Sequence, residues 1–237
     1  MSLPVGEALE GWKPPERPST VALEGRWVSV SPLAADAVAG LWKALGDDEH
    51  ATWTYMGYGP FASRSELEDL VESWVGGDDP VFFTFDVEGQ PQGWGAYLRI
   101  NPAAGSVEVG HLVFGPGLRR TAAATEAMYL MARRVFETGY RRYEWKCDAL
   151  NHRSRGAAER LGFIYEGTFR QHMVYKGRNR DTAWYSMLDT EWPERRHRFE
   201  TWLDPANFDS SGAQIHRLSG GRGGGVDGGG VYRSGYD

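Results

Sequence analysis

The sequence predicts an α+β fold built on a mixed, mostly antiparallel sheet that is flanked by helices. A strand pattern and two helical patterns come first, and three strand-like runs joined by short turns follow. Helix and strand then alternate before a final pair of strands. Strands joined by short turns lie antiparallel, whereas strands joined through a helix are parallel neighbours. The order therefore predicts one parallel pair within an otherwise antiparallel sheet.

The first half of the chain supplies a strand, two helices and a three-stranded meander. Residues 20–33, TVALEGRWVSVSPL, are rich in β-branched residues and alternate like a strand. Helical spacing of apolar residues predicts a helix over 34–47, ending near Gly46, and a second over 66–75, opened by Ser63 or Ser65. The meander strands are predicted over 81–87, 93–100 and 106–114.

The second half begins with a long helix that starts near Arg120 or Thr121 and stops at Gly139. Its apolar face carries Met128, Met131, Ala132 and Val135. The remaining elements are predicted as a strand over 143–150, a short helix over 151–163 and antiparallel strands over 165–177 and 181–188. The strands on either side of the long helix, 106–114 and 143–150, should form the parallel pair.

Composition at the two ends of the chain differs from that of the middle. Residues 1–18 contain four prolines and predict an extended arm. Residues 209–237 are dominated by Gly and Ser and predict a disordered tail, because they have too few apolar residues to offset their ordering entropy. We therefore expect one folded domain over residues 19–208.

Bulk properties exclude several classes of protein. With 237 residues and 41% hydrophobic content the chain can form a substantial core, and a net charge of −6 argues against a nucleic-acid-binding surface. The single cysteine, Cys147, cannot form an intramolecular disulfide, and its expected environment is a buried, unreactive strand position. No signal peptide, membrane-spanning run or metal-ligand spacing of histidines is evident. We expect a soluble cytoplasmic protein without a bound metal.

The strand–turn–helix over residues 107–135 has the features of an anion-binding site. Four backbone N–H groups at a helix start lack an intrahelical partner, and the helix dipole makes that end positive. Small residues let a phosphate approach the backbone, and flanking arginines add charged hydrogen bonds. Read alone, the segment fits an ordinary helix start better than an anion site. Arg119, Arg120 and residues 121–125 are the candidates.

A second motif follows in NHRSRGAAERLGF. Asn151 stands where a helix N-cap belongs, and Ser154 lies one turn further on. With the arginine–alanine segment, this pair resembles the GNAT N-acetyltransferases, in particular their RimJ/RimL-like branch. The family's acetyl-CoA loop, Arg/Gln-x-x-Gly-x-Gly/Ala, is matched by residues 119–124, and the branch's Ala-Thr-Glu-Ala by residues 124–127. Its second motif, Asn-x-x-Ser before Leu-Gly-Phe, is matched by residues 151–163, and the resemblance covers about residues 21–192.

The resemblance implies a fold in which two parallel strands splay apart to form the acetyl-CoA cleft. Backbone groups of Leu112, Val113 and Phe114 would hold the pantetheine arm, and an amide near Val113 would polarise the thioester carbonyl. The diphosphate would meet Arg119, Arg120, Thr121, Ala122, Ala123, Ala124 and Thr125, while Asn151 and Ser154 would face the pantetheine and its sulfur. Ala122 replaces the usual glycine, a substitution that a helical first turn accommodates.

The resemblance also implies direct attack of an amine on the thioester, which requires a base for the amine proton. Glu108 is the first candidate base, because it lies on the strand beside the expected thioester, and His111 and His172 are second choices. Strand alternation predicts that Glu108 and His111 point to opposite faces. Each histidine is otherwise a hydrogen-bonded strand residue. The glutamate that serves as the base in RimL proteins aligns with Met173 here, and Ser154 would protonate the departing thiolate.

The acceptor amine would lie against an aromatic loop, HATWTYMGYGPF. Candidate contacts are Trp53, Tyr55, Tyr58, Trp94 and His172, although the same aromatic side chains suit a packed core. We expect an N-acetyltransferase that acts on a protein N-terminus or a small amine, with a homodimer left open and no nucleic-acid or membrane partner. The alternatives are a non-catalytic acyl-CoA sensor and a purely structural protein.

Overall fold

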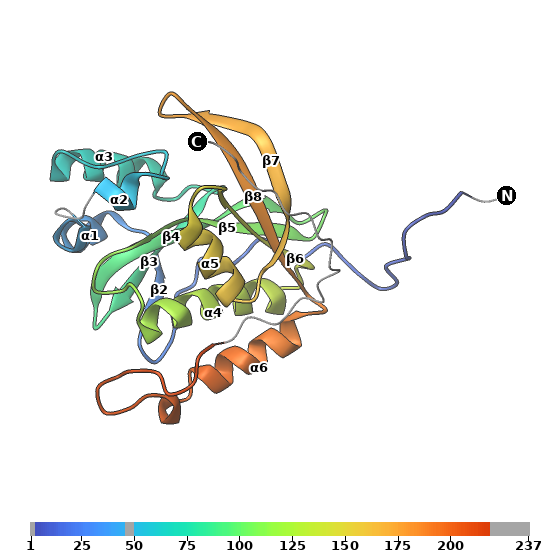
Figure 1. The fold of residues 1–237 in the computed structure, drawn as a ribbon. Coiled ribbons are helices and arrows are strands. Elements are labelled where there is room, and N and C mark those ends of the chain that lie inside the picture. Colours follow the sequence, from blue (N-terminus) through green and yellow to red (C-terminus); the bar gives the residue numbers. More distant parts are fainter. Residues whose placement is uncertain (1–2, 46–49, 219–237) are drawn as a thin grey trace, which may run out of the picture.

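The computed structural model of the chain describes residues 3–45 and 50–218 and has one eight-stranded sheet (Figure 1). The strands are β1 (Leu23–Glu24), β2 (Ser29–Pro32), β3 (Val81–Val87), β4 (Gln90–Asn101), β5 (Ser106–Phe114), β6 (Arg142–Asp148), β7 (Ile164–Tyr175) and β8 (Arg178–Leu188). The helices are α1 (Val38–Leu45), α2 (His50–Trp53), α3 (Arg64–Trp74), α4 (Ala122–Glu137), α5 (His152–Arg160) and α6 (Trp192–Trp202). Two short 3₁₀ turns complete the described elements, Ala35–Ala37 and Pro205–Asn207.

The sheet has the strand order β1-β2-β3-β4-β5-β6-β8-β7. Strands β5 and β6, which α4 connects, are parallel, and the other neighbouring pairs in the described chain are antiparallel. The predicted fold class, a mixed and mostly antiparallel sheet with one parallel pair and flanking helices, is therefore confirmed. Ser63 caps α3, since its side chain accepts a hydrogen bond from the Glu66 amide.

Helices cover both faces of the sheet and enclose two separate hydrophobic cores. The larger core lies against α4, α5 and α6 and includes Val109, Met131 and Tyr143. The smaller core lies under α1 and α3 and includes Leu41 and Trp94. Figure 1 shows α1 and α3 on one side of the sheet and α4 and α6 on the other. Because neighbouring side chains of a strand point to opposite faces of the sheet, one packs into the larger core and the next into the smaller core.

Two short strands replace the single strand expected over residues 20–33. The chain turns at Gly25, whose amide donates to the Val28 carbonyl over 2.9 Å. The buried carboxylate of Glu126, in α4, accepts hydrogen bonds from the amides of Arg26 (2.8 Å), Trp27 (2.7 Å) and Val28 (3.2 Å). A Cβ atom at Gly25 would lie 2.5 Å from this carboxylate, which explains the glycine. Glu126 therefore anchors the β1–β2 turn to the first half of α4.

Replacement of Glu126 by Ala is expected to destabilise the protein by about 3 kcal/mol, because three amides lose a charged acceptor. For a domain of this size that corresponds to a decrease in Tm of about 6–12 °C, measurable by thermal denaturation. Glu137→Ala is the matched control, because Glu137 lies on the same helix but makes exposed ion pairs. Equal melting temperatures for the two variants would contradict the anchoring role.

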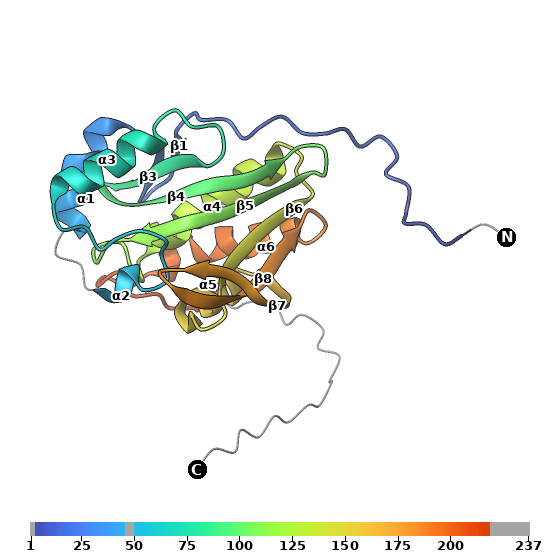
Figure 2. The ribbon, with the colours of Figure 1, turned by 90° about the horizontal axis from the view of Figure 1, so that it is seen from above.

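Some residues in the two terminal segments, which were predicted as an extended arm and a disordered tail, pack against the folded domain. In the arm, Pro15 and Pro18 are buried and Trp12 lies under the Arg141 guanidinium, 5.9 Å from it, while the first described residues extend away from the domain (Figure 2). In the segment predicted as a tail, the Leu218 side chain is only 8% exposed.

A hydrogen bond also fixes this C-terminal segment, since the Asn207 side-chain amide donates to the His216 carbonyl over 3.1 Å. Residues 209–217 are exposed, so Leu218 is the buried residue of this segment. Helix α6, which the sequence did not predict, contacts the segment through Trp202, whose indole donates to the Gln214 side chain over 2.9 Å. Residues 1–2, the predicted helix end at Gly46 and residues 219–237 lie outside the described residues.

Candidate active site

The parallel strands β5 and β6 separate along their length. They are paired from Ser106 opposite Arg142 to Val109 opposite Trp145, and no further pair joins them in the described chain. Beyond that point β5 continues along β4 as far as Phe114, and β6 continues along β8 as far as Asp148. The two strands therefore part at Gly110, as the splayed-strand prediction requires.

A β-bulge lies in β5 where the strands part. Val113 is opposite Trp94 and Gly110 is opposite Ala96, so β5 has one residue more than β4 across this step. His111 takes up the extra residue with a φ of 52°, in the left-handed region. Bulges of this kind redirect side chains, and here the redirected side chain is an imidazole.

The bulge places His111 and Glu108 on the same face of the sheet. Strand neighbours Val107 and Val109 point into the core beneath α4, so Glu108 points to the opposite face. The His111 ring lies 5.1 Å from the ring of Phe82, which belongs to the core on that same opposite face. The prediction that the two candidate bases point to opposite faces was wrong, because simple alternation does not include the extra residue.

Glu108 is almost fully buried, with 4% exposure, and is held by two cations. Its Oε2 lies 2.8 Å from the Lys146 Nζ and 2.8 Å from an Arg99 guanidinium nitrogen. Burial raises the pKa of this carboxyl above its ordinary value, and Lys146 and Arg99 oppose part of that shift. A carboxylate with a raised pKa is a better proton acceptor than an exposed one.

A chain of charges continues from Glu108 across the sheet. Lys146 also bonds Glu144 at 2.7 Å, and its Nζ lies 3.6 Å from the centre of the Trp184 ring. Glu144 in turn pairs with Arg142 at 2.7 Å. Sequence reasoning assigned no part to Lys146, although charged residues at alternate positions of β6 were a signal that one face of this strand is polar.

The turn into α4 exposes a row of amide groups. Thr121 is the N-cap, and its hydroxyl accepts from the Ala124 amide at 3.2 Å and donates to the Leu118 carbonyl at 2.7 Å. Within residues 3–45 and 50–218, no hydrogen-bond acceptor is found for the backbone N–H of residues 120, 121, 122 or 123. Four consecutive open N–H groups at the positive end of a helix suit an anion.

Ala122 is the first residue of α4 and does not have a positive φ, so this position does not require glycine. The left-handed residue in the turn is Arg120, with a φ of 61°. Two further groups of the predicted cradle already have partners in the protein. The backbone N–H of Ala124 donates to the Thr121 cap, and the Thr125 hydroxyl accepts a hydrogen bond from Arg160 at 3.1 Å. The predicted diphosphate site therefore narrows to the amides of residues 120–123.

Arg119 fastens the end of β5 to α2. Its Nε donates to the Phe114 carbonyl over 2.7 Å, and another guanidinium nitrogen donates to the Thr52 hydroxyl over 2.6 Å. Arg119 was predicted to contact the diphosphate; in this structure its guanidinium bonds Phe114 and Thr52, and the diphosphate contact stays a prediction. Of the other β5 residues predicted to line the site, Val113 is buried in the smaller core, while Leu112 and Phe114 are half-buried.

Asn151 and Ser154 occupy the start of α5 as expected. The Asn151 side chain caps the helix by accepting from the Ser154 amide at 3.0 Å. The Ser154 hydroxyl accepts from the Trp145 indole at 3.0 Å and lies near the Cys147 thiol. Burial raises the pKa of that thiol, which keeps Cys147 protonated and unreactive at neutral pH.

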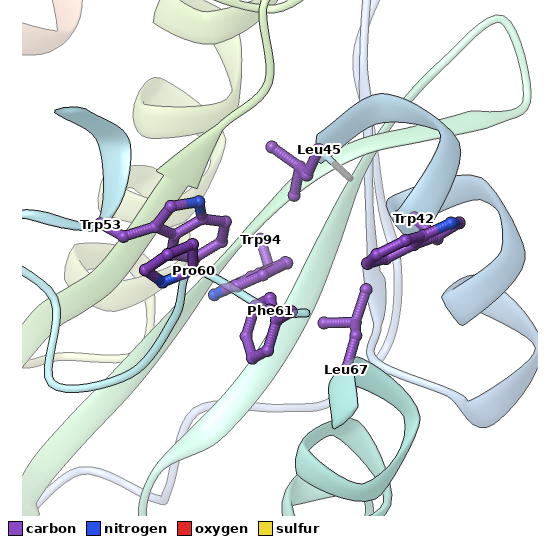
Figure 3. Close-up of a pocket in the computed structure, with 7 residues that line it drawn as sticks. All are labelled: Trp42, Leu45, Trp53, Pro60, Phe61, Leu67 and Trp94. Carbon is purple, nitrogen blue, oxygen red and sulfur yellow. The ribbon is translucent and has the colours of Figure 1, made fainter. Parts of the chain in front are cut away.

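Two of the predicted acceptor contacts are core residues. Trp53 is 2% exposed and Trp94 is 0% exposed, and both border a cavity of about 10 Å³ between α1, α3 and the sheet (Figure 3). That volume holds at most one water molecule, so these rings do not contact an acceptor there. The aromatic loop packs inward because Trp53 belongs to the smaller core and Tyr58 and Phe61 pack against that core.

Of the other predicted acceptor contacts, Tyr58 packs partly buried against the smaller core, and Tyr55 and His172 lie nearer the surface. The Tyr55 hydroxyl donates to the Leu150 carbonyl at 3.1 Å, and the His172 Nδ1 lies 3.0 Å from the Thr182 hydroxyl. The β7–β8 hairpin contacts the aromatic loop through Lys176, whose Nζ donates to the carbonyls of Trp53 (2.8 Å) and Gly59 (3.0 Å).

Within residues 3–45 and 50–218, His, Cys, Asp and Glu side chains form no group of three or more that could hold a metal ion. In the same part of the chain, no helix combines the length and the apolar composition needed to cross a bilayer.

Comparison with known proteins identifies the family. Residues 28–164 match the model of the acetyltransferase (GNAT) domain, and no curated protein matches the sequence. The structure resembles that of a GCN5-related N-acetyltransferase from Brucella melitensis, with 45% identity, a TM-score of 0.86, and 89% of this chain and 97% of that chain covered.

Two further solved structures have the same fold. A probable acetyltransferase of the GNAT family from Chromobacterium violaceum has 39% identity and a TM-score of 0.76, with coverage of 81% and 98%. The microcin C7 self-immunity acetyltransferase MccE, solved in complex with acetyl-CoA and AMP, has 17% identity and a TM-score of 0.63, with coverage of 69% and 93%. The chain described here therefore belongs to the GNAT acetyltransferase family and is an acyltransferase.

Proposed function

We propose that the protein transfers the acetyl group of acetyl-CoA to a primary amine, by direct attack of the amine in a ternary complex. The observation that carries this proposal is the position of Glu108. This buried carboxylate lies where β5 and β6 begin to part, and the open amides of residues 120–123 lie beyond the end of the same strand β5. The opening between β5 and β6 would thus have Glu108 as a proton acceptor at one end and the amides of residues 120–123 as an anion site at the other.

The residues present fit acetyl-CoA. The N–H groups of residues 120–123 would bind the diphosphate, with Ala122 in place of glycine. The β5 edge from Gly110 to Phe114, which β6 no longer pairs, would hold the pantetheine through backbone groups of Leu112, Val113 and Phe114. Bound there, acetyl-CoA supplies an activated acetyl thioester.

Proton transfers are assigned to Glu108 and Ser154. Glu108 would accept the proton of the incoming amine, directly or through water. Ser154 accepts a hydrogen bond from the Trp145 indole at 3.0 Å, which leaves the serine its own hydrogen to donate, and in this structure the serine is also hydrogen-bonded to the Cys147 side chain. It would deliver that hydrogen to the departing thiolate.

The acceptor would be a protein N-terminus or a small amine, bound on the face that carries Glu108. Tyr55 and His172 remain proposed contacts, whereas Trp53 and Trp94 act only by packing beneath this face. The Ala-Thr-Glu-Ala run at residues 124–127 and the closing strand pair β7–β8 support placement in the RimJ/RimL-like branch. We propose the cytoplasm as its compartment.

The test is release of free thiol from acetyl-CoA by the purified protein in the presence of a panel of amines and N-terminal peptides. Acceptor-dependent release is expected with at least one of them. No release above background, combined with a clear increase in Tm on addition of acetyl-CoA, would favour the second candidate, a non-catalytic acyl-CoA sensor. The observation behind that candidate is that Arg99 and Lys146 already neutralise Glu108.

A further inference from the structure

Three side chains from separate segments form a short hydrogen-bonded row beside the bulge. The Trp94 indole nitrogen, in β4, lies 3.1 Å from the Tyr58 hydroxyl, in the loop between α2 and α3. The same hydroxyl lies 3.3 Å from the Nδ1 of His111 in β5. The rings of Tyr58 and His111 stack with centroids 5.8 Å apart and planes only 4° from parallel.

The chemistry of these three groups decides which of them donates and which accepts each hydrogen bond in the row. An indole N–H can only donate, so the Tyr58 oxygen accepts from Trp94. Tyr58 then has one hydrogen to donate, and the His111 Nδ1 is the acceptor found for it among the described residues. If His111 donated instead, the buried phenol would keep an unsatisfied hydrogen, which folded proteins avoid.

We infer that Tyr58 is a positioning residue that fixes His111 as the tautomer with its hydrogen on Nε2. In this tautomer Nδ1 accepts from Tyr58 and Nε2 carries the ring's single hydrogen. His111 then has no free lone pair with which to take a proton from the acceptor amine. It is a neutral hydrogen-bond donor beside the opening, and proton removal falls to Glu108. This assignment rests on the proposed function.

The surroundings of His111 hold the ring in place and keep it neutral. Its left-handed backbone turns the ring towards Tyr58, and Trp74 and Phe82 pack against it with centroids at 6.1 and 5.1 Å. Burial lowers the pKa of His111 to about 4, and the Arg99 guanidinium contributes to this decrease. The ring is therefore uncharged across the physiological range.

The tautomer can be measured without any substrate, by two-bond ¹H–¹⁵N correlation NMR of protein labelled with ¹⁵N-histidine. The His111 signals are identified by their absence from a His111→Gln variant. At pH 7 we expect the shift of Nδ1 to be that of a bare ring nitrogen and the shift of Nε2 that of a protonated one. A hydrogen on Nδ1, or a charged ring at pH 7, would overturn the inference.

The Tyr58→Phe variant tests the cause of this state. Loss of the donor should leave His111 as a mixture of tautomers and raise its pKa, with a decrease in kcat of up to about tenfold and an unchanged KM for acetyl-CoA. Tyr55→Phe is the matched control, since it removes a hydroxyl of the same loop that bonds Leu150 instead. Its His111 signals should match those of the unaltered protein.

An unchanged tautomer in Tyr58→Phe would also overturn the role given to Tyr58. The NMR readout is independent of the proposed function: if acetyl-CoA failed to raise the Tm of the unaltered protein, the proposed function would fall while the tautomer could still be as expected. The unaltered protein decides the tautomer even if the variant does not fold.

Discussion

Replacement of Glu108 by Gln is expected to lower kcat by about two to four orders of magnitude, the contribution typical of a positioned general base. The amide keeps the shape of the side chain but cannot accept the amine proton. Acetyl-CoA should still bind, because the amides of residues 120–123 are untouched. Steady-state thiol release and the increase in Tm with acetyl-CoA measure the two effects separately.

Glu144→Gln is the matched control for this substitution. It also removes a carboxylate from Lys146, 2.7 Å away, and Glu144 lies directly opposite Glu108 on β6, where Arg142 pairs with it at 2.7 Å. Its kcat should stay within a few-fold of the unaltered protein. A similar loss of kcat in both variants would mean that the ion-pair chain, and not proton acceptance by Glu108, limits turnover.

The pH dependence of kcat follows from the same carboxyl. Burial raises the pKa of Glu108 above 4.5, so the basic form is lost at a higher pH than for an exposed glutamate. The rate should therefore rise with pH through this raised value, and the limb should be absent from Glu108→Gln. For stability the sign is opposite: with the folded-state pKa raised, the contribution of Glu108 is present below its ordinary pKa and is lost as pH rises through the folded value.

Replacement of Ala122 by Asp is expected to weaken acetyl-CoA binding by about 30- to 1000-fold without destabilising the fold. A carboxylate in the first turn favours the helix by about 0.3–1 kcal/mol through its dipole. The same charge near the diphosphate site repels the ligand by about 2–4 kcal/mol. Calorimetric titration with acetyl-CoA and thermal denaturation of the free protein measure the two quantities.

Ala122→Gly serves as the control, since it installs the glycine that resembling sequences carry. Because the φ of Ala122 is not positive, glycine should change the affinity by no more than about threefold. Tight binding by the Asp variant would show that the diphosphate does not meet the start of α4.

The order of the elements from the three-stranded meander to the final strand pair was predictable, because it depends on local periodicity and on short turns. The parallel pair, for example, followed from the long helix between two strand patterns. The bulge at His111 was not predictable from the sequence. One extra residue leaves the strand pattern recognisable, but it reverses the face of every side chain beyond it. For that reason the sequence separated Glu108 from His111 and the structure brings them to one face.

Residue types at the site were easier to predict than their partners. The sequence located Arg119 beside the helix start, but an arginine there pairs with whichever oxygen the fold brings near, and here that is Phe114. Trp53 and Trp94 were candidate acceptor contacts because aromatic residues serve both binding and packing. Glu126 lay within a recognised motif, yet its partners are about 100 residues away in sequence.

The central claim is that acetyl-CoA lies where β5 and β6 part, with its diphosphate at the start of α4. A crystal structure of the protein with acetyl-CoA tests it most directly. We predict diphosphate oxygens within hydrogen-bonding distance of the amides of Ala122 and Ala123, and the thioester on the side of the sheet opening nearest Glu108. A diphosphate bound elsewhere, with those amides facing only water, would contradict the claim.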